Sequence, residues 1–69
     1  MRIILRNYKT RQYLQDLDRW TDNPSLAMAF EHSRQAANLA YEQGLKHVEI
    51  LLAFEDARYN FRLPLRAPA

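Results

Sequence analysis

VEILLAFE, residues 48–55, decides the fold of this 69-residue chain. Every second position from Val48 to Phe54 is apolar, and alternate side chains of an extended chain point to the same face of a sheet. The other parity mixes Leu51 and Ala53 with two glutamates. The stretch therefore predicts the central strand of a sheet with one well-buried face.

Two strand-like segments precede it. Residues 2–8 alternate Ile and Leu with Arg, and residues 11–17 follow after a polar pair, so together they predict a hairpin. Asp16 and Asp18 suggest a bend, after which Arg19-Trp20-Thr21 resumes an extended course.

One strand-like segment follows it. Apolar residues alternate from Tyr59 to Leu65 after a turn at residues 55–58. Pro64 has no N–H to donate, so this strand is expected at an edge of the sheet.

Helix signals occupy the middle of the chain. Asn23-Pro24 pairs a capping side chain with a first helical residue that needs no donor, which predicts a helical turn. Ser33 either continues the apolar stripe or caps a new helix, and the narrow face of Ala36, Ala37 and Ala40 suits close packing on a sheet. Gly44 is suited to the left-handed residue that ends a helix near Gln43.

These elements give the order ββαββ, an α+β fold in which one main helix packs on one face of an antiparallel-rich sheet. The chain is short enough for one core only, so residues 1–69 are expected to form a single small domain with residues 66–69 as a loose tail. Its 48% hydrophobic content argues against disorder.

The composition also bounds the compartment and the sources of stability. The chain has no cysteine, its N-terminal apolar run at residues 1–6 is too short for a signal peptide, and no segment approaches the length of a membrane-spanning helix, so a cytoplasmic protein is expected. A core of this size supplies only about 3–5 kcal/mol, which makes oligomerisation the leading source of further stability.

Catalytic and cofactor motifs are scarce. A single glycine excludes Gly-rich phosphate loops, and Ser25 and Ser33 lie where helix caps are expected, so neither an enzyme nor a cofactor site is predicted. His32 and His47 are interpreted as surface and turn residues. The remaining alternative, a very small enzyme or toxin-type nuclease, would require a pocket that joins one of them to a carboxylate. The acidic residues Asp16, Asp18 and Asp22 read as a solvated turn, with no calcium-loop glycine or glutamate; Glu55 is a bare alternative as a general base.

Basic charge offers a second class of function. Residues 1–20 and 57–69 each carry a formal charge of +3, whereas residues 21–56 carry −4. Basic side chains interleaved with tyrosines are typical of nucleic-acid contacts, although arginines on a solvated sheet face are also ordinary. Trp20 either stacks on such a ligand, anchors a partner or closes the sheet against the helix. The candidate nucleic-acid contacts are Arg6, Lys9, Arg11 and Arg62.

Apolar residues on the second parity of the sheet point to self-association. Ile4, Leu51 and Ala53 should face away from the helix if their neighbours face it, and a one-helix fold leaves that face open. The leading hypothesis is a non-enzymatic protein-interaction module that uses this face, most simply as a homodimer. Scattered exposed apolar side chains are the alternative.

Several of these segments, taken together, suggest a resemblance to known proteins. Tyr13-Leu14-Gln15, the turn Trp20-Thr21-Asp22-Asn23-Pro24, Ala29-Phe30 and the alanines of residues 36–40 resemble small uncharacterised bacterial and phage-type α+β proteins. The resemblance covers most of the chain, implies the fold alone and carries no functional residue.

Overall fold

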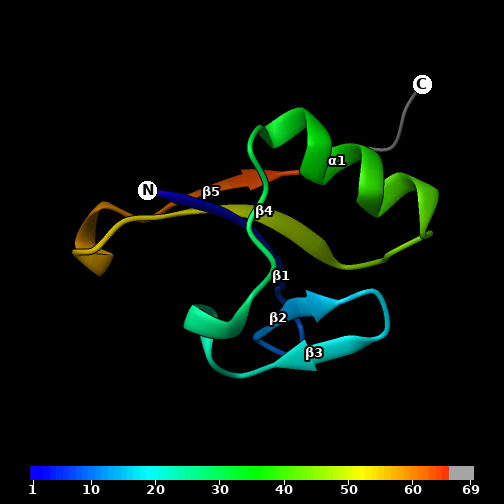
Figure 1. The fold of residues 1–69 in the computed structure, drawn as a ribbon, viewed down its shortest axis with the longest axis horizontal. Coiled ribbons are helices and arrows are strands. Elements are labelled where there is room, and N and C mark those ends of the chain that lie inside the picture. Colours follow the sequence, from blue (N-terminus) through cyan, green and yellow to red (C-terminus); the bar gives the residue numbers. More distant parts are fainter. Residues whose placement is uncertain (66–69) are drawn as a thin grey trace.

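Five strands form one antiparallel sheet in the order β3-β2-β1-β4-β5 (Figure 1). The computed structural model describes residues 1–65, so the expected tail at 66–69 lies outside the described residues. The α+β class and the single main helix agree with the sequence. The strands are β1 (Arg2–Asn7), β2 (Gln12–Asp16), β3 (Arg19–Thr21), β4 (Val48–Ala53) and β5 (Phe61–Pro64).

Three strands precede the helix rather than the expected two, which makes the order βββαββ. The bend around Leu17 is a tight turn in which the Asp16 carboxylate accepts the Leu17 N–H at 2.8 Å. Arg19–Thr21 folds back from this turn onto β2 with a register shift, and it becomes a strand of its own. Residues 19–21 are extended as predicted, but three residues are too few to be identified as a strand from their pattern.

The positions of β4 and β5 follow the sequence with one correction. β5 is an edge strand, as Pro64 predicted. β4 is interior and pairs with β1 over six residues, but the centre of the sheet is β1. The strongest alternation in the sequence therefore belongs to an interior strand and not to the middle one.

The helix α1 (Ser33–Glu42) ends as expected and begins slightly differently. Gly44 has a φ of +62°, the left-handed conformation predicted for it. Ser33 is the first helical residue, and the N-cap is His32, whose side chain makes no capping hydrogen bond. The expected separate turn is the 3-10 helix η1 (Pro24–Leu26), where the Asn23 side chain accepts the Ser25 N–H at 3.0 Å.

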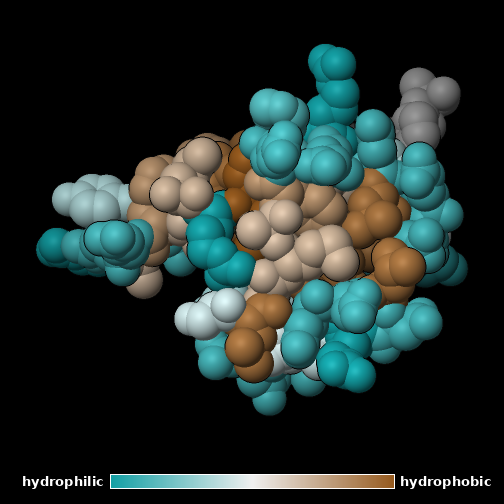
Figure 2. All heavy atoms as spheres, in the orientation of Figure 1, coloured by the Kyte–Doolittle hydropathy of each residue, from teal (hydrophilic) through white to brown (hydrophobic). Residues whose placement is uncertain are grey.

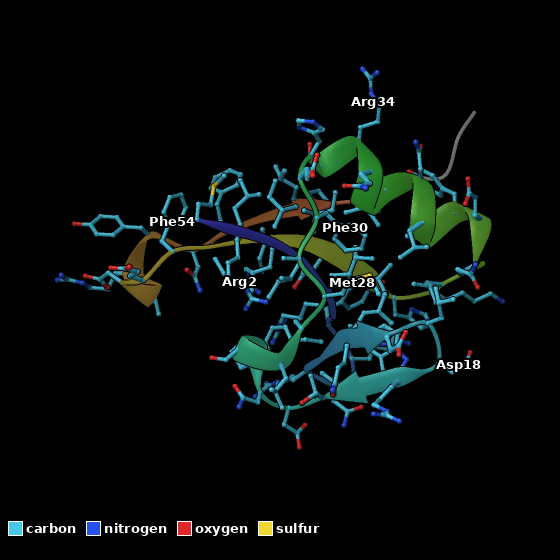
Figure 3. All side chains as sticks on the ribbon, in the orientation of Figure 1. Arg2, Asp18, Met28, Phe30, Arg34 and Phe54 are labelled. Carbon is cyan, nitrogen blue, oxygen red and sulfur yellow. The ribbon has the colours of Figure 1, made fainter. Side chains whose placement is uncertain are left out.

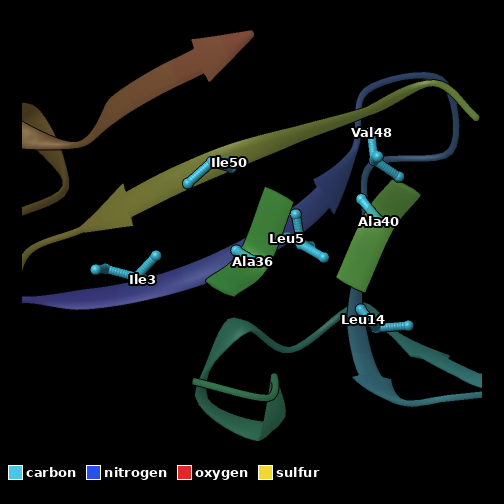
Figure 4. Packing of buried hydrophobic residues seen from close by; sticks show 7 residues of the cluster. All are labelled: Ile3, Leu5, Leu14, Ala36, Ala40, Val48 and Ile50. Atoms are coloured by element: carbon cyan, nitrogen blue, oxygen red, sulfur yellow. The ribbon is translucent and has the colours of Figure 1, made fainter. Parts of the chain in front are cut away.

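The main core lies between α1 and the sheet (Figure 4). Ala36 and Ala40 are the buried residues of α1, and their small side chains let the helix approach the strands closely. Leu5 and Leu14 beneath them are 0% and 1% exposed. We call this group the helix-side core, and its buried members are Ile3, Leu5, Leu14, Ala36, Ala40, Val48 and Ile50.

The segment that joins η1 to α1 passes from one face of the sheet to the other. Its Ala27 packs with Ile4 on the face opposite α1, whereas Phe30 packs against the helix-side core (Figure 3). The Met28 N–H donates to the Leu14 carbonyl of β2, and the Phe30 N–H donates to the Ile3 carbonyl of β1, both at 2.8 Å. The segment therefore fills the space where β1 and β2 diverge, and both strands hold it in place.

Candidate interaction surface

The face expected to be open is covered by the chain itself. Ile4 is 0% and Leu51 6% exposed, and they form a buried cluster with Ala27, against which Tyr13 and Ala53 pack. The prediction that this face is open is wrong for Ile4 and Leu51, because the chain returns across the face after β3, whereas Ala53 is half-buried.

Arg2 on β1 holds the covering segment, residues 24–27, against the sheet. Its guanidinium donates hydrogen bonds to the carbonyls of Pro24 and Ala27, one at each end of η1 (Figure 3). A planar guanidinium can reach two acceptors at once, which a lysine ammonium does less well. Residues 24–27 are therefore held over Ile4 by a charged side chain from the neighbouring strand.

A groove of about 500 Å³ remains on this face beside the cover. It lies between η1 and the 3-10 helix η2 (Ala57–Tyr59), and Leu51 and Ala53 line it together with Met1 and Phe54. Ile4 is not part of its lining. Two of the three residues expected on the interaction face thus reach a concave surface, and the third lies wholly inside the protein.

A group of exposed apolar side chains lies at the end of β4 and β5 that α1 does not cover (Figure 1), where apolar and hydrophilic residues adjoin on the surface (Figure 2). We call it the hairpin patch and define it by Met1, Phe54, Tyr59 and Phe61, which are 69%, 40%, 65% and 57% exposed. Arg2 pairs with Ala53 and Leu52 with Phe61, so the preceding and following residues Met1 and Phe54 also lie close together. This end of the hairpin projects from a molecule that measures 34 Å along its longest axis and 22 Å along the others.

The sequence analysis did not predict the hairpin patch, although comparing the length of the helix with that of the strand would have indicated it. A helix of ten residues spans about 15 Å, whereas the seven residues from Val48 to Phe54 span about 23 Å when extended. One helix of this length leaves the Phe54 end of the strand without a partner. Alternation alone predicts burial along the whole strand, because it carries no information on the length of the covering element.

The turn that carries Tyr59 is well ordered by side-chain hydrogen bonds. The Asp56 carboxylate accepts the Arg58 N–H at 3.0 Å and the Arg58 guanidinium at 2.7 Å, and the Asn60 side chain accepts the Phe54 N–H at 2.7 Å. The side-chain and backbone hydrogen bonds from Arg58 lower the pKa of Asp56. The bond from Asp56 in turn raises the pKa of Arg58, whose guanidinium lies 5.9 Å from the centre of the Tyr59 ring.

The four candidate nucleic-acid residues lie in three different parts of the fold. Arg6 on β1 forms a salt bridge with Glu49 at 2.8 Å, and the two side chains are only 18% and 13% exposed. Lys9 and Arg11 are exposed in the β1–β2 turn, and Arg62 is exposed on β5, two strands away from β1. The charge of Arg6 is thus matched within the protein.

The remaining candidates have local partners or exposed positions. Trp20 packs against the helix-side core, in agreement with the structural one of the three roles considered for it. Asp22 accepts from the Gln12 amide at 3.3 Å, and Ser25 and His32 are exposed beside helix starts. His47 and Glu49 line the same pocket, which is the juxtaposition that the sequence required of an enzyme, but Glu49 is the partner of Arg6.

Two absences apply to residues 1–65. No three side chains of the metal-ligating types gather into a group there. The described part of the chain also has no helix with the length and hydrophobicity needed to cross a membrane.

Comparisons with known proteins give no relative. The chain has no significant match among protein-family models, curated protein sequences or solved structures. The resemblance to small bacterial and phage-type proteins thus stays a prediction, and the function has to be inferred from the molecular surface itself.

Proposed function

We propose that this chain is a protein-interaction module without catalytic activity, and that it forms a homodimer through the hairpin patch. The observation that carries the proposal is the gathering of four large apolar side chains at one end of the sheet, where α1 leaves them uncovered. Contiguous apolar patches on small proteins are commonly sites of association.

The size of the hairpin patch suits a modest dimer interface. A buried aromatic side chain covers about 150–250 Å², so the exposed parts of the three aromatic residues and Met1 amount to roughly 400 Å². Homodimer interfaces are about 65% apolar, which extends the surface covered to roughly 600 Å² per copy. A standard interface buries about 800 Å² per partner.

The charges around the hairpin patch favour a second copy of the same chain. Among the neighbouring side chains, Glu55, Asp56, Arg58 and Arg62 sum to zero, and the guanidinium of Arg2 is bonded to the Pro24 and Ala27 carbonyls, so no large charge of one sign opposes a second copy. The only side chains of the core that are both large and fully buried are Ile4, Leu5 and Leu14 among the described residues, and covering the patch adds apolar burial to a small core.

The local chemistry supports a binding role more than a catalytic one. Glu49 is the carboxylate that lines the same pocket as His47, and it is already ion-paired with Arg6. Arg62 and Pro64, which lacks an N–H, also make the edge of β5 unfavourable for pairing with another strand. We therefore propose association through side-chain packing of the hairpin patch and not through strand pairing.

Sedimentation of matched variants tests the proposal. The wild-type chain is expected to dimerise at about 100 µM, and Phe61→Asp to raise the dissociation constant at least about tenfold, because an aromatic contact is lost and a charge is placed in the interface. Leu17→Asp is the control, since Leu17 is similarly exposed but lies in the β2–β3 turn. Tyr59→Asp, outside the strands, gives the same test without altering β5.

Two results would overturn the proposal. One is a wild-type chain that stays monomeric at about 1 mM, where even weak specific contacts are populated. The other is a dimer that Leu17→Asp weakens as much as Phe61→Asp and Tyr59→Asp do.

A further inference from the structure

A pocket of about 450 Å³ opens at the other end of the sheet from the hairpin patch. Its floor is apolar and comes from three elements, with Ala40 on α1, Leu45 in the following turn and Val48 at the start of β4. The volume lies within the range of about 300–1,000 Å³ that is usual for small-molecule sites. This pocket is separate from the interaction surface and is independent of the proposed dimer.

One wall of the pocket is a fixed pair of aromatic rings. Tyr8 and His47 meet edge to face, with ring centres 5.8 Å apart and planes at 82°. The Tyr8 N–H donates to the His47 carbonyl at 2.9 Å, and the Tyr8 hydroxyl lies 3.4 Å from His47 Nδ1. His47 also has a φ of +62°, a strained backbone conformation for a residue with a side chain. The wall is therefore positioned by contacts from both the backbone and the side chains.

The charges at the pocket favour a neutral ligand. Glu49 is the only carboxylate that lines it among the described residues, and the 2.8 Å bond from Arg6 balances its charge. An organic cation would lack an unpaired anion to bind, and no lysine or arginine of the described residues lines the pocket to bind an anion. What the rim offers instead is hydrogen bonding, from the Tyr8 hydroxyl and the His47 imidazole.

We propose that this pocket binds a small neutral aromatic or heteroaromatic molecule. A flat ring packs between the Tyr8–His47 wall and the apolar floor, where offset and edge-to-face contacts between rings are favourable. A hydrogen-bonding group on the ring reaches the Tyr8 hydroxyl or the imidazole at the rim. The ring contacts select an aromatic ligand over an aliphatic one of similar size.

Titration of the isotope-labelled chain with indole, followed by nuclear magnetic resonance, tests this. Indole is expected to shift the amide signals of Leu45, His47 and Val48 with a dissociation constant of about 1 mM, and cyclohexanol to bind at least about fivefold more weakly. Tyr8→Ala is expected to weaken indole binding at least about tenfold, whereas Tyr8→Phe, which keeps the ring, weakens it less. Leu17→Ala, at an exposed residue in the β2–β3 turn outside the pocket and the hairpin patch, is the control and leaves indole binding unchanged.

A second measurement uses the unaltered chain, so that the test does not depend on whether Tyr8→Ala folds. Nuclear Overhauser contacts from indole to the methyl groups of Leu45 and Val48 are expected in the wild-type protein. Their absence at about 10 mM indole would overturn the proposal, as would shifts centred on Phe54 and Phe61 or equal binding of cyclohexanol.

Discussion

The two ends of β4 carry the same alternating pattern and have opposite surroundings. Val48 and Ile50 at one end are 6% and 4% exposed beneath α1, whereas Phe54 just beyond the other end is 40% exposed. The difference arises because the chain before α1 crosses the sheet between β1 and β2, and the helix that follows is shorter than the hairpin (Figure 1). Alternation thus identifies the face on which a side chain lies, and the length of the covering element decides whether it is buried.

Truncation of one apolar side chain at each end is expected to give the largest contrast. Leu5→Ala removes a fully buried side chain from the helix-side core and should lower the free energy of unfolding by about 2–5 kcal/mol, enough to unfold much of a domain this small. Phe54→Ala should cost less than about 1 kcal/mol in the monomer.

Urea unfolding at low protein concentration measures both changes. Dilution keeps any dimer from contributing to the stability of the Phe54 variant. Equal losses for Leu5→Ala and Phe54→Ala would show that the Phe54 end of the sheet is as well buried as the helix end, and would remove the contrast between them.

A smaller effect is expected from weakening the hydrogen bonds by which Arg2 holds residues 24–27 over the face opposite α1. Arg2→Lys keeps the charge but loses the fork that reaches both Pro24 and Ala27, and should lower stability by about 1 kcal/mol. Amide exchange at Met28, whose N–H is bonded to Leu14, should become faster. Arg62→Lys on exposed β5 is the matched control, and a comparable effect there would rule out a specific role for Arg2.

The smallest effect is expected on the stability of the turn beside the hairpin patch when the pH is lowered. The pKa of Asp56 lies below its ordinary value of 3.8 because Arg58 donates hydrogen bonds to it, so the unfolded chain binds this proton more readily. The contribution of the Asp56–Arg58 contact is complete above pH 3.8 and is lost as the pH falls through the lowered pKa.

Carbon chemical shifts of the Asp56 carboxyl group report its titration. The midpoint should lie below 3.8 in the wild-type chain and return toward that value in Arg58→Gln. Arg34→Gln, which changes an exposed arginine at the start of α1, should leave the midpoint unaltered. Identical midpoints in the wild-type chain and Arg58→Gln would contradict the assigned cause.

Local signals predicted much of this fold because they depend on neighbouring residues. Asn23-Pro24 starts η1, Gly44 ends α1, and Pro64 indicates an edge strand, as the chemistry of each residue requires. The third strand could not be predicted in this way because Arg19–Thr21 is too short to show a period, and it depends on pairing with β2.

The interaction surface was harder to predict because it depends on what covers each face. Alternation places Ile4 and Leu51 correctly on the face opposite α1, but nothing in their own sequence shows that residues 24–27 return over them. The exposed apolar side chains therefore lie at the end of the hairpin, at Phe54 and Phe61, and not on the sheet face opposite α1 where they were expected.

Binding of a second copy of the chain at the hairpin patch is tested most directly by the dependence of the amide spectrum on concentration. Between about 10 µM and 1 mM, we expect signals of residues 52–62 to shift together along one binding curve while those of α1 stay fixed. A spectrum that does not change over this range, or changes confined to α1 and the β1–β2 turn, would contradict a dimer formed through the hairpin patch.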